Sequence, residues 1–323
     1  MKPGILIAAL IAAQALFAGA TAQAQGSYPS RPVKVICGFP AGTSADIMAR
    51  IYAQKLSEKF GQQFVVENRL GASGNLAADL TARSDADGYT LLLGTVANSI
   101  SASAFKNISH DFSKDFAPIA VVSEAPNILV VSEGLGAKSV ADLIRLAKEK
   151  ELFFGSAGVG TAPHLSGELF NMMAGVKMVH VAYRGNSQGL LDLVSGRLGA
   201  IFAPAPTLAA FVQDSRVKAL ALTTAKRSQQ YPNLPTLDES GLKGFDTSIW
   251  YGFLAPKGTP PAIVKTLSDA LVEAGQAADV QMQLQRNGSE RLVITGDEMR
   301  KFIDQDVAKW KKVVEFAGIQ NQN

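Results

Sequence analysis

Short β-branched runs alternate with helical patterns along most of the chain. Residues 33–37, VKVIC, are followed by small turn-forming residues and then by a helical pattern from about 45 to 60. Strand-like runs recur at 63–67, 89–94, 117–122, 127–131, 152–156, 179–183, 200–203 and 217–223, and helical patterns at 74–84, 139–150, 163–172, 188–195, 260–276 and 296–316. Strand–helix–strand units of these lengths predict an α/β fold with a parallel sheet.

The first 24 residues have a different pattern. Lys2 precedes an uncharged stretch from residue 4 to residue 20, and Ala22-Gln23-Ala24 has the form of a cleavage site. This is the pattern of a secretory signal peptide. A transmembrane anchor is the alternative, but the densest apolar part, residues 5–18, is shorter than the ~20 residues of a spanning helix. We therefore predict that residues 1–24 are a signal peptide and that the mature protein is exported to the periplasm.

Length and charge narrow the class of protein. The remaining chain of about 300 residues exceeds a usual single core, which predicts two domains. Without the lysine of residues 1–24 it has 31 − 1 = 30 basic and 28 acidic residues, too small a bias to indicate nucleic acid or a membrane surface.

Cys37 is the one cysteine, so we expect a buried core residue and no internal disulfide. His110, His164 and His180 are far apart in sequence, so a metal site has little support.

Two glycine-containing loops carry the candidate chemistry. Residues 39–46, FPAGTSAD, and 155–161, GSAGVGT, each join a predicted strand to a helix start. Backbone N–H groups at a helix start are unpaired, and small residues let a ligand oxygen approach them. The second loop has Thr161 where a nucleotide-binding loop has lysine, and the chain has no G-x-G-x-x-G motif. The pair therefore favours a small anion, most simply a carboxylate, although either loop alone is also explained by an ordinary tight turn.

No catalytic motif stands at a suitable place. One alternative is an exported hydrolase that uses Ser156, His164 and Glu168. The interpretation that we favour is that His164 caps or packs against its helix start and that Asp46 offsets a helix dipole. The sequence therefore predicts a binding protein and no enzyme, with no metal and no cofactor.

Ordered motifs along the whole mature chain resemble the Bug family, the extracytoplasmic solute receptors of tripartite tricarboxylate transporters. They include FPAGTSADIMAR (39–50), VENRLGASGN (66–75), DGYTLLLGT (87–95), GSAGVGTAPHL (155–165) and WYGFLAPKGTP (250–260). The resemblance implies a type II periplasmic-binding-protein fold, with two α/β domains around a ligand cleft. It places one domain at 28–127 plus 251–323 and the other at 128–250.

The resemblance also implies a function. The receptor is expected to be a monomer that closes around a small carboxylate and delivers it to the permease subunits of the transporter. A ligand sensor for a membrane signalling partner is the alternative. The implied ligand-binding positions lie on loops at strand ends: Phe39, Ala41, Gly42, Thr43, Asp46, Ser156, Gly158, Gly160, Thr161 and His164, with Tyr183 and Gly185 on the other wall.

Three departures from the family pattern lie where the variable part of the ligand is expected. Thr43 replaces the second glycine of an A-G-G loop, and Asn98 and Ser99 stand in a segment that commonly carries Thr-His and Asn-Pro. Ala203 stands where an aspartate is common, and an aspartate would pair with an ammonium group. We therefore expect a plain or aromatic carboxylate as the ligand, and no amino acid.

Overall fold

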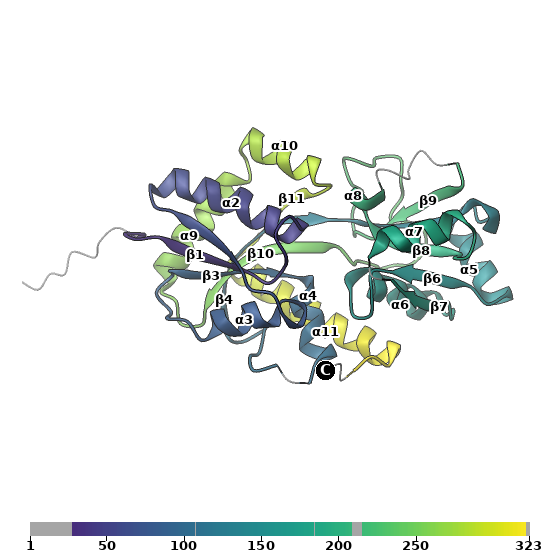
Figure 1. Ribbon diagram of the computed structural model, residues 1–323, viewed down its shortest axis with the longest axis horizontal. Coiled ribbons are helices and arrows are strands. Elements are labelled where there is room, and N and C mark those ends of the chain that lie inside the picture. Colours follow the sequence, from purple (N-terminus) through teal and green to yellow (C-terminus); the bar gives the residue numbers. More distant parts are fainter. Residues whose placement is uncertain (1–27, 107, 184, 209–214, 321–323) are drawn as a thin grey trace, which may run out of the picture.

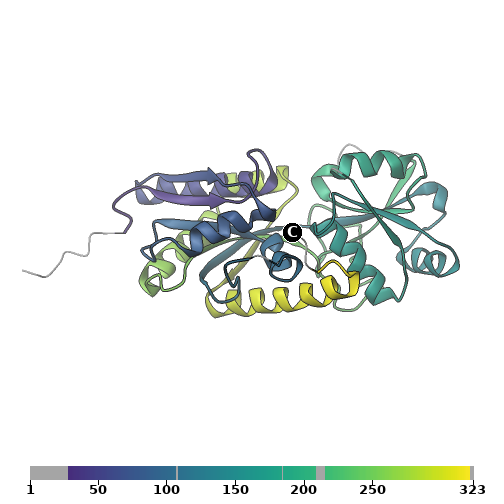
Figure 2. The ribbon, with the colours of Figure 1, turned by 60° about the horizontal axis from the view of Figure 1, so that its bottom comes forward.

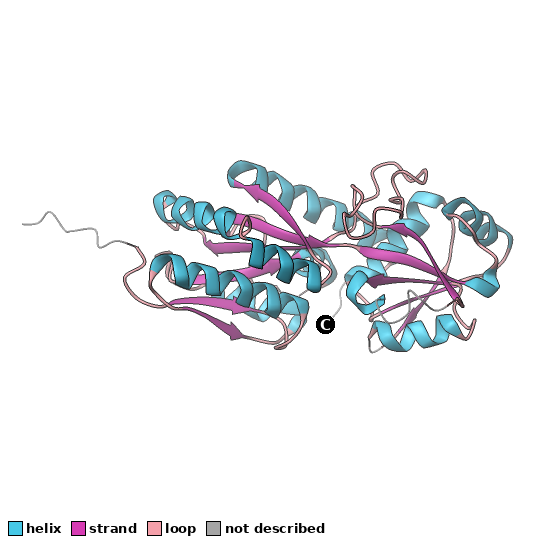
Figure 3. Cartoon of the chain, turned by 90° about the horizontal axis from the view of Figure 1, so that it is seen from above, coloured by secondary structure: helices cyan, strands magenta, loops and turns pink. Residues whose placement is uncertain are grey.

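The computed structural model describes residues 28–106, 108–183, 185–208 and 215–320. The chain forms two α/β lobes that lie end to end and give the molecule an elongated shape (Figures 1 and 3). The predicted signal peptide, residues 1–24, lies outside the described residues. Within the described part, no helix combines the length and the apolar character needed to cross a membrane.

The first lobe is built on a six-stranded sheet with the order β11-β4-β10-β3-β1-β2. β1 is parallel to β2 and β3, whereas β10 is antiparallel to both β3 and β4, and β11 is antiparallel to β4. The strands are β1 (Val33–Cys37), β2 (Phe64–Asn68), β3 (Thr90–Thr95), β4 (Phe116–Ala125), β10 (Ile249–Pro256) and β11 (Glu290–Thr295). The helices are α2 (Ser44–Phe60), the short η1 (Ala72–Gly74), α3 (Asn75–Ala82), α4 (Val96–Ala104), α9 (Pro261–Ala274), α10 (Ala278–Arg286) and α11 (Gly296–Ala317).

The second lobe is built on a five-stranded sheet with the order β7-β6-β8-β5-β9. β6 is parallel to β7 and β8, and β5 is antiparallel to β8 and β9. The strands are β5 (Asn127–Ser132), β6 (Phe153–Ser156), β7 (Val179–Ala182), β8 (Ala200–Pro204) and β9 (Val217–Leu222). The helices are η2 (Glu133–Leu135), α5 (Val140–Glu149), α6 (Ala162–Ala174), α7 (Asn186–Val194) and α8 (Ala205–Leu208).

Most elements predicted from the sequence are present, with ends shifted by up to three residues. The prediction of a parallel sheet was wrong in part, because each sheet is mixed. β10 and β11 run against the other strands of the first sheet, and β5 runs against the other strands of the second. The sequence analysis also missed α4, β10, α10 and β11. Cys37 is buried and unpaired, as predicted.

The chain crosses between the lobes in two neighbouring segments. β4 ends at Ala125 and β5 begins at Asn127, so a single residue separates a strand of one sheet from a strand of the other. The return segment joins β9 to β10. The crossings are bonded to each other, because Thr223 N–H donates to Asn127 O (3.0 Å) and Thr247 N–H donates to Thr223 O (2.9 Å).

The crossings fix which edges of the two sheets face each other. β4 and β3 are both antiparallel to β10 and so run in the same direction. Because β4 leads out of its sheet into the second lobe, the carboxyl ends of β1, β2 and β3 point toward that lobe. β5 enters antiparallel to β8, so the carboxyl ends of β6, β7 and β8 point back toward the first lobe. The loops that follow these six strands therefore face each other.

One of the hydrophobic clusters of the molecule includes residues of both lobes. It includes Leu254 and Trp310 of the first lobe together with Leu129 and Phe202 of the second. Helix α11 packs against α4 and β4 of its own lobe and reaches α6 of the other, as the yellow helix in Figure 2 shows. The lobes are thus joined by packing on this side as well as by the two crossings.

Gly167 of α6 gives a test of how tightly this helix packs on its sheet. A β-carbon at Gly167 would lie 2.1 Å from the ring of Phe154, which is fully buried. Alanine normally favours a helix interior by about 1 kcal/mol over glycine. We nevertheless expect Gly167→Ala to lower the free energy of unfolding by about 1–3 kcal/mol, because the added methyl overpacks the core. Urea denaturation followed by circular dichroism measures this change.

Gly134→Ala is the matched control for this prediction. Its added β-carbon would meet nothing nearer than Ser132 Oγ at 3.8 Å, so we expect little change in stability. Equal stability of the two variants would contradict the packing described here.

Candidate ligand-binding site

The loop between β1 and α2 is held from behind by a buried carboxylate. Asp46 is 2% exposed and accepts hydrogen bonds from Gly42 N–H (2.9 Å), Arg50 Nε (3.0 Å) and Asn68 Nδ2 (2.8 Å). Burial alone would raise the pKa of Asp46, but the hydrogen bonds from Arg50, Gly42 and Asn68 outweigh it and lower that pKa below its usual value. Asp46 therefore holds the loop in place through Gly42, and its negative charge is balanced by Arg50.

Loops that follow β1, β2 and β3 meet at Gly74. A β-carbon at Gly38 would lie 2.5 Å from Gly74 Cα, so the two backbones approach too closely for any side chain. Gly74 has a φ of +92°, and a β-carbon there would lie 3.4 Å from the Phe39 ring and 3.7 Å from Asn98 Nδ2. Ala72 adopts a positive φ (+45°) in the same turn. This strained turn brings the predicted residues Phe39 and Asn98 together.

Several buried polar atoms at this junction have no hydrogen-bond partner within the described part of the chain. Asn98 Oδ1 accepts from Thr95 N–H (2.9 Å), but Asn98 Nδ2 is unpaired, as is the hydroxyl of fully buried Ser99. Asn75, 3% exposed, has both side-chain amide atoms unpaired. A buried polar group without a partner costs about 1–3 kcal/mol. Asn75 was missed in the sequence analysis, although it directly follows Gly74 in the VENRLGASGN motif.

The loop between β6 and α6 closes on itself through its own side chains. Thr161 caps α6 by accepting from His164 N–H (3.4 Å), and its hydroxyl donates to Gly158 O (2.7 Å). Gly158 N–H donates to Ser156 Oγ (3.1 Å), and Gly160 N–H donates to His164 Nδ1 (3.1 Å). These bonds explain how a loop with positive φ at both glycines keeps a defined shape.

The N–H groups of three loop glycines are hydrogen-bonded within the protein. The N–H groups of Gly42, Gly158 and Gly160 are bonded to Asp46, Ser156 and His164. The N–H groups of Ala41, Ala157 and Val159 are among the loop donors that make no hydrogen bond within the described part of the chain.

The remaining predicted positions differ in accessibility. Tyr183 donates its hydroxyl proton to Asp192 Oδ2 (2.7 Å), and Gly185 precedes α7 with a φ of +149°. Burial and the Asp192 carboxylate raise the pKa of Tyr183 to about 12. Ala203 is fully buried in an apolar cluster with Ile128 and Leu190, so its side chain presents no surface to a ligand in this structure.

The structure contradicts the proposed hydrolase triad. Ser156 Oγ lies 2.7 Å from His180 Nε2. His164 faces elsewhere, because its Nδ1 accepts from Gly160 and its Nε2 lies 3.5 Å from Glu168 Oε1. The Ser156–His164 hydrogen bond that such an enzyme requires is therefore replaced by two separate contacts.

Charge at the loops after β1, β3 and β6 comes from backbone dipoles, whereas Arg69 follows β2 and is paired with Glu67, and the segment after β7 includes Arg184. Residues 38–44, 72–74, 95–98 and 156–161 include neither lysine nor arginine. Helices α2, α4 and α6 begin at these loops, and the start of a helix carries a partial positive charge. Within the described residues, no group of three or more His, Cys, Asp or Glu side chains is placed to hold a metal ion. The arrangement suits an anion held by neutral donors.

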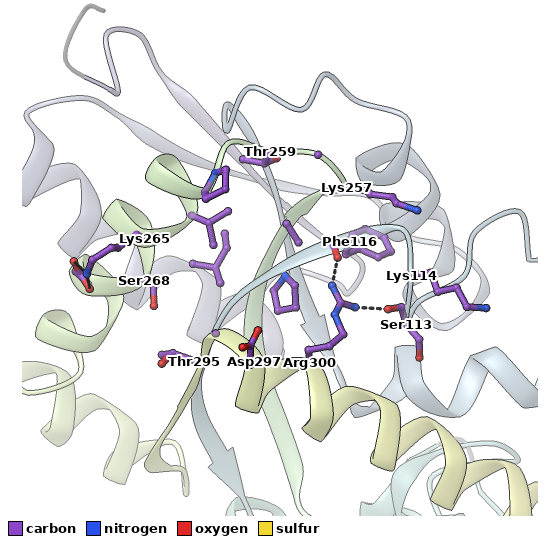
Figure 4. Close-up of a pocket in the computed structure, with 18 residues that line it drawn as sticks. Ser113, Lys114, Phe116, Lys257, Thr259, Lys265, Ser268, Thr295, Asp297 and Arg300 are labelled. Atoms are coloured by element: carbon purple, nitrogen blue, oxygen red, sulfur yellow. Dashed lines mark hydrogen bonds and ion pairs between the residues drawn. The ribbon is translucent and has the colours of Figure 1, made fainter.

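A cavity of about 820 Å³ lies elsewhere on the first lobe (Figure 4). It is lined by residues of α9, the start of α11 and the first half of β4, and includes none of the predicted positions. Arg300 lies in it with its guanidinium bonded to the carbonyl oxygens of Ser113 and Phe116. This cavity is separate from the facing loops.

Comparison with known proteins identifies the family. Residues 48–319 match the model of the tripartite tricarboxylate transporter family receptor. The chain belongs to this family, the Bug receptors. Protein BugT of Bordetella pertussis is 34% identical over 296 residues, which cover 90% of this chain and 91% of BugT. A protein of Pseudomonas sp. strain P51 is 33% identical over 305 residues, covering 93% of this chain and 91% of that protein.

Solved structures of Bug receptors have the same two-domain α/β binding-protein fold. An R. palustris protein with adipate has a TM-score of 0.75 and 35% identity, covering 91% of this chain and 100% of that one. The periplasmic binding protein BugD has a TM-score of 0.71, 31% identity and the same coverage. MatC from Rhodopseudomonas palustris with bound malate has a TM-score of 0.70 and 28% identity, covering 89% and 100%. Family members are periplasmic solute-binding receptors, not enzymes.

The Asp46 network predicts a pH-dependent loss of stability. We expect Asp46→Asn to lower the free energy of unfolding at pH 7 by about 1–3 kcal/mol, because the charged hydrogen bonds at the loop are weakened. The pKa of Asp46 is lowered on folding, so its contribution is present above its ordinary value of 3.8 and is lost as the pH falls below it. The difference in free energy of unfolding between wild type and variant, measured by urea denaturation, should therefore be smaller at pH 3 than at pH 7.

Asp269→Asn is the control for this prediction, since Asp269 makes an exposed ion pair with Lys265 that is worth little. An Asp46 variant as stable as this control at pH 7 would rule out a supporting role for the network.

Proposed function

We propose that the mature protein is a periplasmic receptor that binds a small carboxylate between its lobes. Closed around its ligand, it delivers the carboxylate to the permease of a tripartite tricarboxylate transporter. The observation that carries the proposal is that loops from both lobes face each other at the carboxyl ends of six parallel strands and have no cationic side chain in residues 38–44, 72–74, 95–98 and 156–161. Open α/β sheets bind their ligands at such edges.

The ligand carboxylate is held by unpaired backbone donors of both lobes. Ala41 and Val159 supply N–H groups beside the starts of α2 and α6. The neighbouring residues Thr43 and Thr161 donate their hydroxyl protons to Pro40 O and Gly158 O and so support the loops. The loop glycines allow the close approach, while Asp46 and His164 keep the loops in shape from behind. Hydrogen bonds to a charged group contribute about 1.5–3 kcal/mol each, so a few neutral donors suffice to hold a carboxylate.

The second end of the ligand lies against the first lobe at Asn98. The unpaired Asn98 Nδ2 and the two unpaired amide atoms of Asn75 are suited to a polar group such as a further carboxyl. Two structural neighbours were determined with the dicarboxylates adipate and malate. Ala203 offers no partner for an ammonium group, which favours a plain or aromatic carboxylate over an amino acid.

Closure is driven by contacts that the ligand makes with both lobes at once. A ligand shifts a conformational equilibrium only through its differential affinity for the two states. Here a carboxylate that contacts the loops after β1 and β6 gains its full set of donors when the lobes approach. The two crossing segments at residues 125–127 and 223–249 take up the movement. The receptor acts as a monomer, with domains at 28–127 plus 251–323 and 128–250.

A thermal-shift series tests the proposed function. The chain from residue 25 onward is unfolded, washed free of co-purified ligand, refolded and titrated with adipate, malate, benzoate and aspartate. A ligand at a hundredfold its dissociation constant stabilises the folded state by about 2.7 kcal/mol, so we expect clear shifts with a dicarboxylate or benzoate. Shifts with aspartate alone would overturn the ligand class, and no shift with any acid would overturn carboxylate binding.

Asn98→Asp tests the contact with the second end of the ligand. The new carboxylate still accepts a hydrogen bond from Thr95 N–H and so retains the helix cap. The substitution removes the Nδ2 donor, and the negative charge repels an anion. We expect the affinity for adipate, measured by calorimetry, to fall at least about tenfold, equivalent to about 1.4 kcal/mol. Asn233→Asp, at an exposed loop position, is the control, and equal affinities of the two variants would remove Asn98 from the site.

A further inference from the structure

Two histidines stack directly behind the loop between β6 and α6. The ring centroids of His164 (α6) and His180 (β7) are 3.7 Å apart, with an angle of 25° between the rings. The ring of Phe154 packs against both, at 6.3 Å from His164 and 5.0 Å from His180. His180 is brought here by the pairing of β6 with β7, which sets it opposite Phe154.

Each ring of the pair holds a different part of the loop. His164 Nδ1 accepts from Gly160 N–H (3.1 Å), and its Nε2 faces Glu168 Oε1 (3.5 Å). This pattern requires a neutral ring with its proton on Nε2. His180 Nε2 bonds to Ser156 Oγ (2.7 Å), which in turn accepts from Gly158 N–H (3.1 Å). The loop is thus fixed at Gly160 by one ring and at Gly158, through Ser156, by the other.

We propose that His180 is a positioning residue and that the stacked His180–His164 pair sets the shape of loop 156–161. The loop in this shape presents Val159 N–H to an anion. The consequence for ligand affinity rests on the proposed function, whereas the shape of the loop does not.

The hydrogen bonds of the two rings define their roles in the loop. A proton on His164 Nδ1 would displace Gly160 N–H, so in this structure that nitrogen is the acceptor. Burial and the neighbouring His164 lower the pKa of His180 to about 3. Glu168 from α6 is the charged group that faces His164, and Ser156 from β6 is the polar group that faces His180.

The contribution of His180 to the stability of the fold depends on pH. His180 has a lower pKa in the folded than in the unfolded chain, so its contribution to stability is complete above its ordinary pKa of 6.5 and declines as the pH falls from 6.5 toward 3. A histidine free in solution would be mostly protonated at pH 5, and His180 in this stack is not.

Nitrogen-15 NMR of the histidine rings in the mature protein tests the pair without any ligand. We expect His164 to be the Nε2–H tautomer at pH 7 and the His180 ring to remain neutral at pH 5. Titration of His180 near pH 6.5, or an Nδ1–H tautomer of His164 at pH 7, would overturn the proposal. This outcome is independent of whether the protein binds a carboxylate.

Two substitutions separate positioning from packing. His180→Gln keeps a hydrogen-bonding group for Ser156 but loses the aromatic ring, whereas His180→Phe keeps the ring and loses the hydrogen bond. We expect the Gly158 amide to exchange at least about tenfold faster in His180→Phe than in His180→Gln, and adipate affinity to follow the same order. Faster exchange in His180→Gln would show that the ring serves packing alone and would overturn the proposal. If adipate does not bind the wild type, the proposed ligand class fails while the amide exchange still decides the role of His180.

Discussion

The bonded pair of crossings between the lobes is the constraint on which the rest of the structure depends. Asn127, Thr223 and Thr247 tie the outgoing and returning segments together where one sheet gives way to the other. β4 leaves the first sheet at the crossings and β10 enters it there, so the two strands run in opposite directions. The other strands of the sheet pair with these two, and their directions relative to the second lobe are therefore fixed. The loops of both lobes face each other for this reason, and no separate interaction is needed to aim them at a common ligand.

The buried charged residues near the candidate site are paired with other protein groups. Asp46, the buried acid of the first loop, is matched by Arg50, Asn68 and a backbone N–H, so neither its charge nor that of Arg50 is available to a ligand. In the second loop His164 accepts a hydrogen bond from Gly160, and His180 has a lowered pKa. A carboxylate bound as we propose would therefore meet helix dipoles and amide groups. Its selectivity would depend on the few polar atoms, such as those of Asn75 and Asn98, that have no partner within the described residues.

Local signals made much of this fold predictable. The β1–loop–α2 and β6–loop–α6 units combine a short apolar strand, glycines and a threonine before the helix, so the sequence alone located both loops. α4 was missed because VANSISASA is mostly small residues, and β10 because IWYGFLAP is buried on both faces and shows no alternation. The partners of the loop N–H groups depend on side-chain directions, and His180 joins Ser156 only through strand pairing, so sequence spacing could not reveal them.

The strand order of the first sheet also governs when each lobe can fold. β10 lies between β3 and β4, although it is made after the whole second sheet, and β11 and the bridging helix α11 come later still. During synthesis the second lobe has all of its strands once Leu222 has emerged, while the first remains two separate pieces without its central strand. The core of the first lobe therefore cannot close until β10, β11 and α11 have been made, so the carboxyl-terminal segment is the one that completes the fold.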